Sequence, residues 1–120
     1  MGFERAASAI GKGLLAGIAA AGARALGGDR ITAAIGPGIG PCCYEVGDDI
    51  AEPYRRRFGT DVLRGRNLDL PEAAERALRE AGVGSIERSD LCTACRPDLF
   101  FSHRRDRGLT GRQGVIAYVT

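Results

Sequence analysis

One run of residues combines side chains that seldom occur together without a chemical role. Two thiols, an imidazole and five arginine guanidinium groups lie between Cys92 and Arg112, and an apolar stretch follows them. Planar guanidinium groups bind phosphate and carboxylate in a bidentate way. We therefore expect Arg104, Arg105 and Arg112 to line an anion site. The alternative is a solvated basic loop.

A glycine-rich segment lies upstream and ends in two adjacent cysteines. Gly36, Gly38 and Gly40 precede Cys42 and Cys43. The backbone N–H groups of such a loop attract anions when a helix follows, and the same position lowers the pKa of a thiol. The glycine spacing matches neither the dinucleotide-binding fingerprint nor a P-loop. A tight turn with buried, inert cysteines is the alternative.

The four cysteines form two pairs. Cys92 and Cys95 have the C-x-x-C spacing of zinc sites and thiol redox proteins. Cys42 and Cys43 would complete four sulfur ligands, but successive side chains of regular structure point in different directions. We expect structural roles for these cysteines and no functional pairing between them. A zinc-binding module built from all four thiols is the alternative.

Length, charge and cysteine spacing limit the class of protein. The chain has 120 residues, of which 44% are hydrophobic, so we expect one domain over residues 1–120. Lys and Arg number 17 against 15 Asp and Glu, and the net charge of +2 gives no reason to expect a nucleic-acid partner. The cysteine spacing is poor for a secreted disulfide framework, and the apolar stretch near the N-terminus is too short to span a bilayer. We expect a cytoplasmic protein without a membrane partner.

Helical and strand patterns alternate along the chain, which predicts an α/β fold with a mixed sheet and flanking helices. We expect Gly27 to end the first helix and Asp69 or Leu70 to cap the last. Pro41 is expected at the start of the middle helix, whose inner face would carry Val46, Ile50 and Tyr54. The predicted helices are 4–26, the segment from 41 onward, and 71–81; the predicted strands are 31–35, 85–89 and 114–119.

Five segments share their order and spacing with one protein family. They are 33–47 (AAIGPGIGPCCYEVG), 68–70 (LDL), 91–95 (LCTAC), 100–106 (FFSHRRD) and 110–112 (TGR). Together they resemble the laccase-domain family, whose members are often labelled multicopper polyphenol oxidases. The resemblance implies a partial α/β/β/α sandwich, the C-terminal half of a family domain. It also implies purine nucleoside phosphorolysis, or adenosine deamination in some members, with purine nucleoside and phosphate as ligands.

The resemblance also implies which parts of the family site are missing. The zinc or copper centre of the family uses two histidines and a cysteine. Ser8 stands in the place of one histidine, and the other two residues have no counterpart in the sequence. A serine hydroxyl does not replace an imidazole as a zinc ligand at comparable affinity. We therefore expect no catalytic metal, no residue of that centre and no activity in this chain alone.

Three functions stay open on the sequence. In the first, the chain is all or part of a purine nucleoside phosphorylase, and Arg104, Arg105 and Arg112 form part of its substrate or phosphate rim. In the second, it is a non-catalytic remnant or subunit that self-associates or binds a partner supplying the missing half, and it exposes apolar surface there. In the third, it is the small cysteine zinc-binding module.

Overall fold

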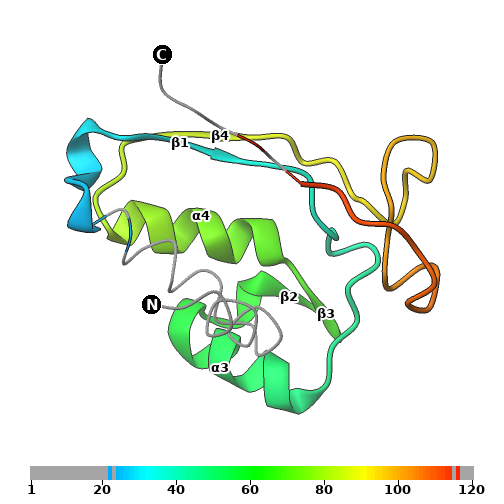
Figure 1. Cartoon of the computed structure of the whole chain (residues 1–120). Coiled ribbons are helices and arrows are strands. Elements are labelled where there is room, and N and C mark those ends of the chain that lie inside the picture. The colour runs from blue at the N-terminus through cyan, green and yellow to red at the C-terminus, as the bar shows by residue number, and fades with distance from the viewer. Residues whose placement is uncertain (1–21, 23, 115, 117–120) are drawn as a thin grey trace.

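The described part of the molecule consists of residues 22, 24–114 and 116 of a computed structural model (Figure 1). Its elements are η1 (Gly28–Arg30), β1 (Thr32–Ile35), α3 (Asp48–Phe58), η2 (Thr60–Val62), β2 (Leu63–Arg64), β3 (Asn67–Leu68), α4 (Leu70–Glu80) and β4 (Ser85–Arg88). β1 pairs with β4 in parallel, and β2 pairs with β3 antiparallel. The α/β class is confirmed, with the parallel and antiparallel pairs in two separate sheets of the described residues.

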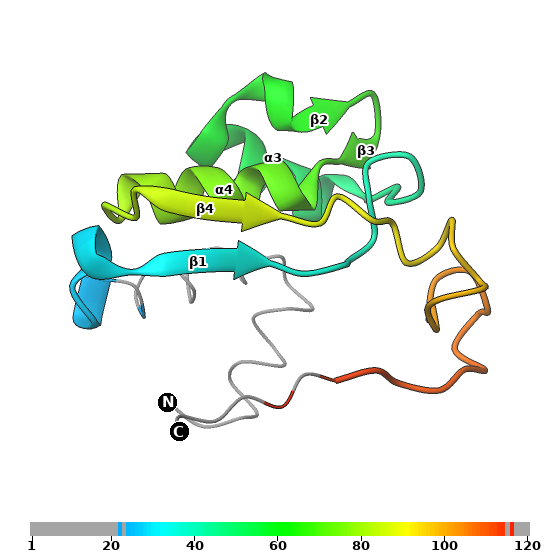
Figure 2. The ribbon, with the colours of Figure 1, turned by 90° about the horizontal axis from the view of Figure 1, so that it is seen from above.

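β1 and β4 run side by side in the same direction (Figure 2), and Ile35 lies opposite Arg88 at their carboxyl ends. The parallel pairing continues past both strands, because Gly38 forms an isolated bridge with Cys92. The N–H of Thr93 donates to the Gly38 carbonyl at 3.0 Å. The loops that leave the two strands therefore stay together.

Helix α4 covers one face of the β1–β4 pair (Figure 1). Asp69 caps this helix, as predicted, and its carboxylate accepts a hydrogen bond from the N–H of Glu72 at 3.2 Å. Arg88 on β4 reaches Glu72 at 2.8 Å and Glu75 at 2.7 Å. Leu78 of α4 and the following Val83 pack against the strands. Their apolar neighbours are Ile31, Ala33, Ile35, Ala81 and Ile86.

A second core lies where α3, η2 and the β2–β3 hairpin meet α4. Val62, Leu68 and Ala73 are fully buried there, and Tyr54 is 2% exposed. Acidic residues occupy the first turn of α3 and arginines its last turn, a distribution that complements the helix dipole. Two of the three residues predicted for the inner face of this helix are confirmed, since Tyr54 is buried in this core and Ile50 packs against it. Val46 is also buried there, but it precedes α3.

The start predicted for this helix was wrong. Residues 41–43 form a turn, and α3 begins only at Asp48. The N–H groups of Cys43 and Tyr44 both donate to the carbonyl of Gly40, at 3.0 and 3.1 Å. A proline such as Pro41 is compatible with the start of a turn and with the start of a helix, so it did not distinguish the two structures.

The strand predicted at 31–35 is confirmed as β1, and its residues alternate between exposed and half-buried. The strand predicted at 85–89 is β4, and the helix predicted at 71–81 is α4. Gly27 has φ 81°, which confirms it as a helix end. Most of the predicted helix 4–26 and strand 114–119 lies outside the described residues.

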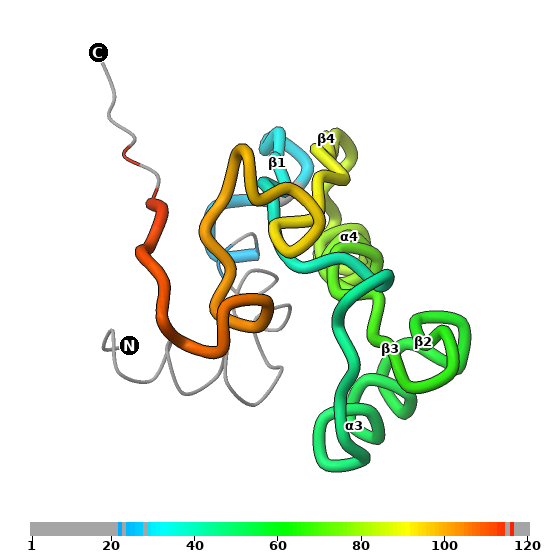
Figure 3. Tube along the Cα trace, turned by 90° about the vertical axis from the view of Figure 1, so that its right-hand side faces the viewer, coloured from blue at the N-terminus to red at the C-terminus, as the bar shows by residue number. Residues whose placement is uncertain are grey.

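The segment after β4, residues 89–114, has no regular element and runs along the side of β1 away from α3 (Figure 3). Among the described residues, no helix is both long enough and apolar enough to cross a bilayer.

Candidate substrate cavity and cysteine cluster

A cavity of about 500 Å³ lies between the glycine-rich loop and the segment that carries the arginines. Its volume is in the range of small-molecule sites. Two aromatic rings, a histidine and two arginines line it, without any carboxylate. The lining residues are Ile39, Tyr44, Thr93, Phe101, Ser102, His103, Arg104, Gly111, Arg112 and Gln113. This composition favours an anionic or polar ligand with a flat apolar part.

Arg104 and Arg112 both line this cavity. Nη1 of Arg104 donates to the Glu45 carbonyl at 2.6 Å, and its guanidinium lies over the Tyr44 ring, 5.3 Å from the centroid. Nη1 of Arg112 donates to the Gly111 carbonyl at 3.0 Å. Within residues 22, 24–114 and 116, the hydrogen bonds of both guanidinium groups use Nη1 alone. The described residues therefore occupy no other N–H group of these two guanidinium groups.

Arg105, the third predicted arginine, lies outside this cavity and is held by its own chain. Its guanidinium donates to the carbonyls of Thr93 at 2.9 Å and Phe100 at 3.1 Å. It also bonds the Asp106 carboxylate at 2.9 Å, and this contact lowers the pKa of Asp106. Arg105 thus fastens the turn that follows Cys92 to the segment that presents Arg104.

Sequence reasoning missed several cavity residues. Tyr44 directly follows the two cysteines, and Phe101 is an exposed aromatic residue that lines the same cavity. Ser102 is buried, and its Oγ accepts a hydrogen bond from the N–H of Arg105 at 3.2 Å, which shapes the turn. His103, the single histidine of the sequence, was given no role there and lies in the cavity wall. Phe101 to Arg104 are consecutive in the sequence, and this adjacency was the feature from which their shared place in the cavity could have been predicted.

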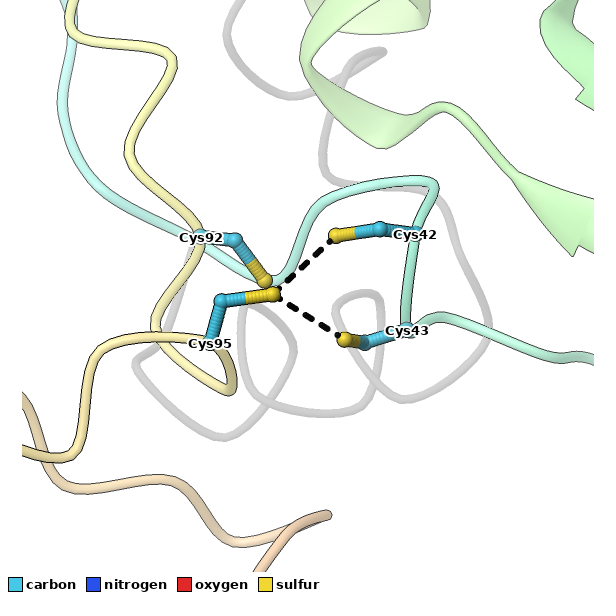
Figure 4. Close-up of side chains that lie close together, drawn as sticks. All are labelled: Cys42, Cys43, Cys92 and Cys95. Carbon is cyan, nitrogen blue, oxygen red and sulfur yellow. Dashed lines mark hydrogen bonds between the residues drawn. The ribbon is translucent and has the colours of Figure 1, made fainter.

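Four cysteines form a cluster beside the cavity (Figure 4). The Sγ atoms of Cys42 and Cys43 each lie 3.4 Å from Sγ of Cys95. All four Sγ atoms, including that of Cys92, lie within 4.8 Å of one another, and all four cysteines are free. Adjacent cysteines looked awkward as joint ligands in the sequence, but the structure brings the sulfurs of both pairs together. Because residues 41–43 form a turn, the alternation of side chains in a strand does not apply to Cys42 and Cys43.

Contacts outside the sulfur atoms hold both cysteine loops. Nδ2 of Asn67 donates to the Pro41 carbonyl at 2.7 Å, which ties the turn with Cys42 and Cys43 to β3. On the other loop, Arg105 donates to the carbonyl of Thr93, between Cys92 and Cys95. Each cysteine loop is therefore held by a side chain from another part of the fold.

The thiols of the cluster differ in acidity. Burial acts to raise the pKa of Cys92, but N–H groups from Gly40, Cys95 and Ala94 outweigh it and lower the pKa to about 6. The Gly40 N–H lies 3.2 Å from this sulfur. The hydrogen bond with Cys95, and secondarily burial, raises the pKa of Cys42 to about 12. The cluster thus favours a thiolate at Cys92 and a thiol at Cys42.

Comparison with known proteins gives one consistent family. The family model described as multi-copper polyphenol oxidoreductase laccase matches residues 6–120. The purine nucleoside phosphorylase YlmD of Geobacillus stearothermophilus is 47% identical over 74% of this chain and 35% of its own length. A purine nucleoside phosphorylase of Deinococcus radiodurans is 44% identical over 73% of this chain and 36% of its own length.

One relative carries a different activity in its name. The adenosine deaminase RL5, from an unknown prokaryotic organism, is 38% identical over 64% of this chain and 33% of its own length. The chain spans about a third of the length of these three relatives. No solved structure matches the chain.

Proposed function

Because the chain belongs to the multi-copper polyphenol oxidoreductase laccase family, we propose that it supplies the phosphate- and nucleoside-binding part of a purine nucleoside phosphorylase site. The convergence of Arg104 and Arg112 on one cavity without a carboxylate carries this proposal. Two relatives named purine nucleoside phosphorylase support it.

The proposed reaction fits the chemistry of the cavity. A phosphate oxygen attacks the anomeric carbon of the ribose, the bond from that carbon to the purine nitrogen breaks, and the base leaves with the electron pair and takes up a proton. The products are ribose 1-phosphate and the free base. Arg104 and Arg112 would hold the phosphate oxygens, and donors placed in advance stabilise charge that develops during reaction. The rings of Tyr44 and Phe101 would contact the purine faces.

The metal that the family name implies does not fit the residues described. Copper sites of the oxidase type combine histidine nitrogens with a cysteine sulfur. In the described part of the chain, the one group of three or more candidate ligands consists of four cysteines, and His103 is not among them. The described residues therefore offer no ligand set of the oxidase type for the proposed reaction. Because the family resemblance aligns Ser8 with a histidine ligand, we propose that this chain alone binds the substrates without turning them over.

We assign Arg105 to positioning rather than to phosphate. Its guanidinium already bonds carbonyls at Thr93 and Phe100 and the carboxylate of Asp106. An anion would have to displace these contacts, whereas Arg104 and Arg112 have N–H groups to spare within the described residues.

Calorimetric titration of the purified chain with inorganic phosphate, and then with adenosine, tests the proposal. A charged hydrogen bond contributes about 1.5 to 3 kcal/mol, so Arg104→Ala and Arg112→Ala should each weaken phosphate binding by about 10- to 100-fold. Arg56→Ala, which removes an exposed arginine of α3, is the matched control and should leave the affinity unchanged. Phosphate that binds equally well to all three variants would remove both arginines from the site.

A turnover assay separates the competing activities. Adenine released only when phosphate is present would mean that the chain completes phosphorolysis alone, against our proposal of binding without turnover. Inosine formed without phosphate would favour the deaminase named among the relatives. A chain that binds neither ligand would contradict the proposal and favour the non-catalytic subunit.

A further inference from the structure

We propose that Cys42, Cys43, Cys92 and Cys95 bind one Zn²⁺ ion in a closed, tetrahedral, structural site. This inference goes beyond the proposed function and rests on a different set of atoms. The site would join the loop that leaves β1 to the loop that leaves β4.

The sulfur positions carry the proposal. A tetrahedral zinc ion with four bonds of about 2.3 Å separates its sulfur ligands by about 3.8 Å. The four Sγ atoms here lie within 4.8 Å of one another, and two of the separations are 3.4 Å. Small side-chain movements would bring all four to bonding distance of a central ion.

Disulfide chemistry explains this arrangement less well. A disulfide needs two sulfurs about 2.05 Å apart, and it commits each sulfur to one partner. Sγ of Cys95 is equally distant from Sγ of Cys42 and of Cys43, so the geometry singles out no pair. A metal ion uses all four sulfurs at once.

The donor set identifies the metal. Four thiolates in a tetrahedron suit zinc or iron, and a site with four protein ligands has no open position for catalysis. Zn²⁺ has no geometric preference from its d electrons, so it tolerates the angle imposed by two adjacent cysteines. This tolerance favours zinc over iron for Cys42 and Cys43.

Contacts around the sulfurs are those of a prepared metal site. The N–H of Gly40 donates to Sγ of Cys92 at 3.2 Å, and such a bond stabilises a metal-bound thiolate. Asn67 and Arg105 hold the backbones of the two cysteine loops through carbonyl contacts. These groups orient the ligands before a metal arrives.

The proposed site would also support the cavity. Tyr44 follows Cys43 directly, and Thr93 lies between Cys92 and Cys95; both residues line the cavity. Zinc would therefore hold two cavity walls in place without contacting the substrate.

The test is elemental analysis of the chain purified under reducing conditions, for zinc, iron and copper together. We expect about one zinc per chain, the stoichiometry of a closed structural site. Cys95→Ser should lose the zinc. Cys95→His should retain it, because Cys₃His is also a structural zinc set and Cys95 is exposed enough to admit a larger side chain. Equal zinc in the wild type and Cys95→Ser would overturn the site, and so would stoichiometric iron or copper.

A second measurement needs no variant and so does not depend on folding of Cys95→Ser. Thiols of the reduced, metal-free chain are counted with a thiol reagent before and after one equivalent of zinc. We expect zinc to protect all four cysteines and a chelator to expose them again. Thiols that react equally with and without zinc would contradict the proposal. A chain that binds phosphate but no zinc would contradict the zinc site and leave the proposed function intact. A chain that binds zinc but no phosphate would support the zinc site and contradict the proposed function.

Discussion

The backbone N–H of Gly40 donates to Sγ of Cys92 at 3.2 Å, between two loops that leave parallel strands. A Cβ at Gly40 would lie 3.3 Å from Cβ of Cys92 and 3.4 Å from Sγ of Cys42, which is tight for both contacts. We expect Gly40→Ala to displace these sulfurs and reduce the zinc content of the purified chain. Gly38→Ala is the matched control, because a Cβ there meets nothing within 4 Å. Equal zinc in the two variants would show that the loop adjusts freely.

Arg105 supports the C-x-x-C turn through the carbonyl of Thr93. Loss of a group that orients metal ligands typically costs about 10- to 100-fold in metal affinity. We expect a loss of that size for Arg105→Ala, measured by competition with a chromophoric zinc chelator. Arg105→Lys should restore little of the lost zinc affinity, because an ammonium group lacks the planar, forked arrangement of N–H donors that a guanidinium has.

The control for this variant is Arg96→Ala, which removes an exposed arginine whose side chain pairs with Asp98. Its zinc affinity should equal that of the wild type. A comparable loss in Arg96→Ala would indicate a general charge effect instead of positioning by Arg105.

Removal of zinc should lower the thermal stability of the chain. A ligand that binds only the folded state stabilises it by about 2.7 kcal/mol at a free concentration 100 times its Kd. We therefore expect the melting temperature, followed by circular dichroism, to fall on treatment with a chelator and to return when zinc is added. The metal-free Cys95→Ser chain should show no response to either reagent.

Asp69→Ala removes the cap of α4. Asp69 is 7% exposed, and its carboxylate accepts a hydrogen bond from the N–H of Glu72, so its loss should cost about 1 kcal/mol of unfolding free energy. Asp69→Asn keeps a capping oxygen and should stay close to the wild type. Urea unfolding measures the free energy of unfolding of both variants. Equal destabilisation of the two variants would mean that the charge matters, through the 3.4 Å contact with Arg64, rather than the cap.

Glu75 links α4 to β4 and gives stability a dependence on pH. Hydrogen bonds from Arg88, and secondarily from Arg79, lower the pKa of Glu75. A carboxyl whose pKa is lower in the folded state stabilises the fold above its unfolded pKa of about 4.3, and this stability is lost as the pH falls through the folded pKa. In urea unfolding measured from pH 6 to pH 3, the free energy of unfolding of Arg88→Ala should therefore fall less steeply than that of the wild type. Arg56→Ala should follow the wild-type curve.

Local features of the fold were predictable because neighbouring residues determine them. The cap at Asp69 and the helix end at Gly27 depend on a side-chain oxygen near free N–H groups and on a positive φ. The start of α3 was missed because Pro41 suits two local structures equally. The resemblance to the laccase-domain family rested on five ordered segments, and the family match confirmed it.

The sites depend on contacts that local sequence does not specify. Cys42 and Cys95 are separated by 53 positions, and their sulfurs meet because β1 pairs with β4 in parallel and the pairing continues to Gly38 and Cys92. Arg104 and Arg105 are neighbours, yet the turn sends one guanidinium to the cavity and the other to backbone carbonyls. The sequence by itself determined β1, α4 and β4, the family and the residue types available for chemistry. Tertiary structure alone decided which of these residues share a site, because strand register and turn geometry set the direction of each side chain.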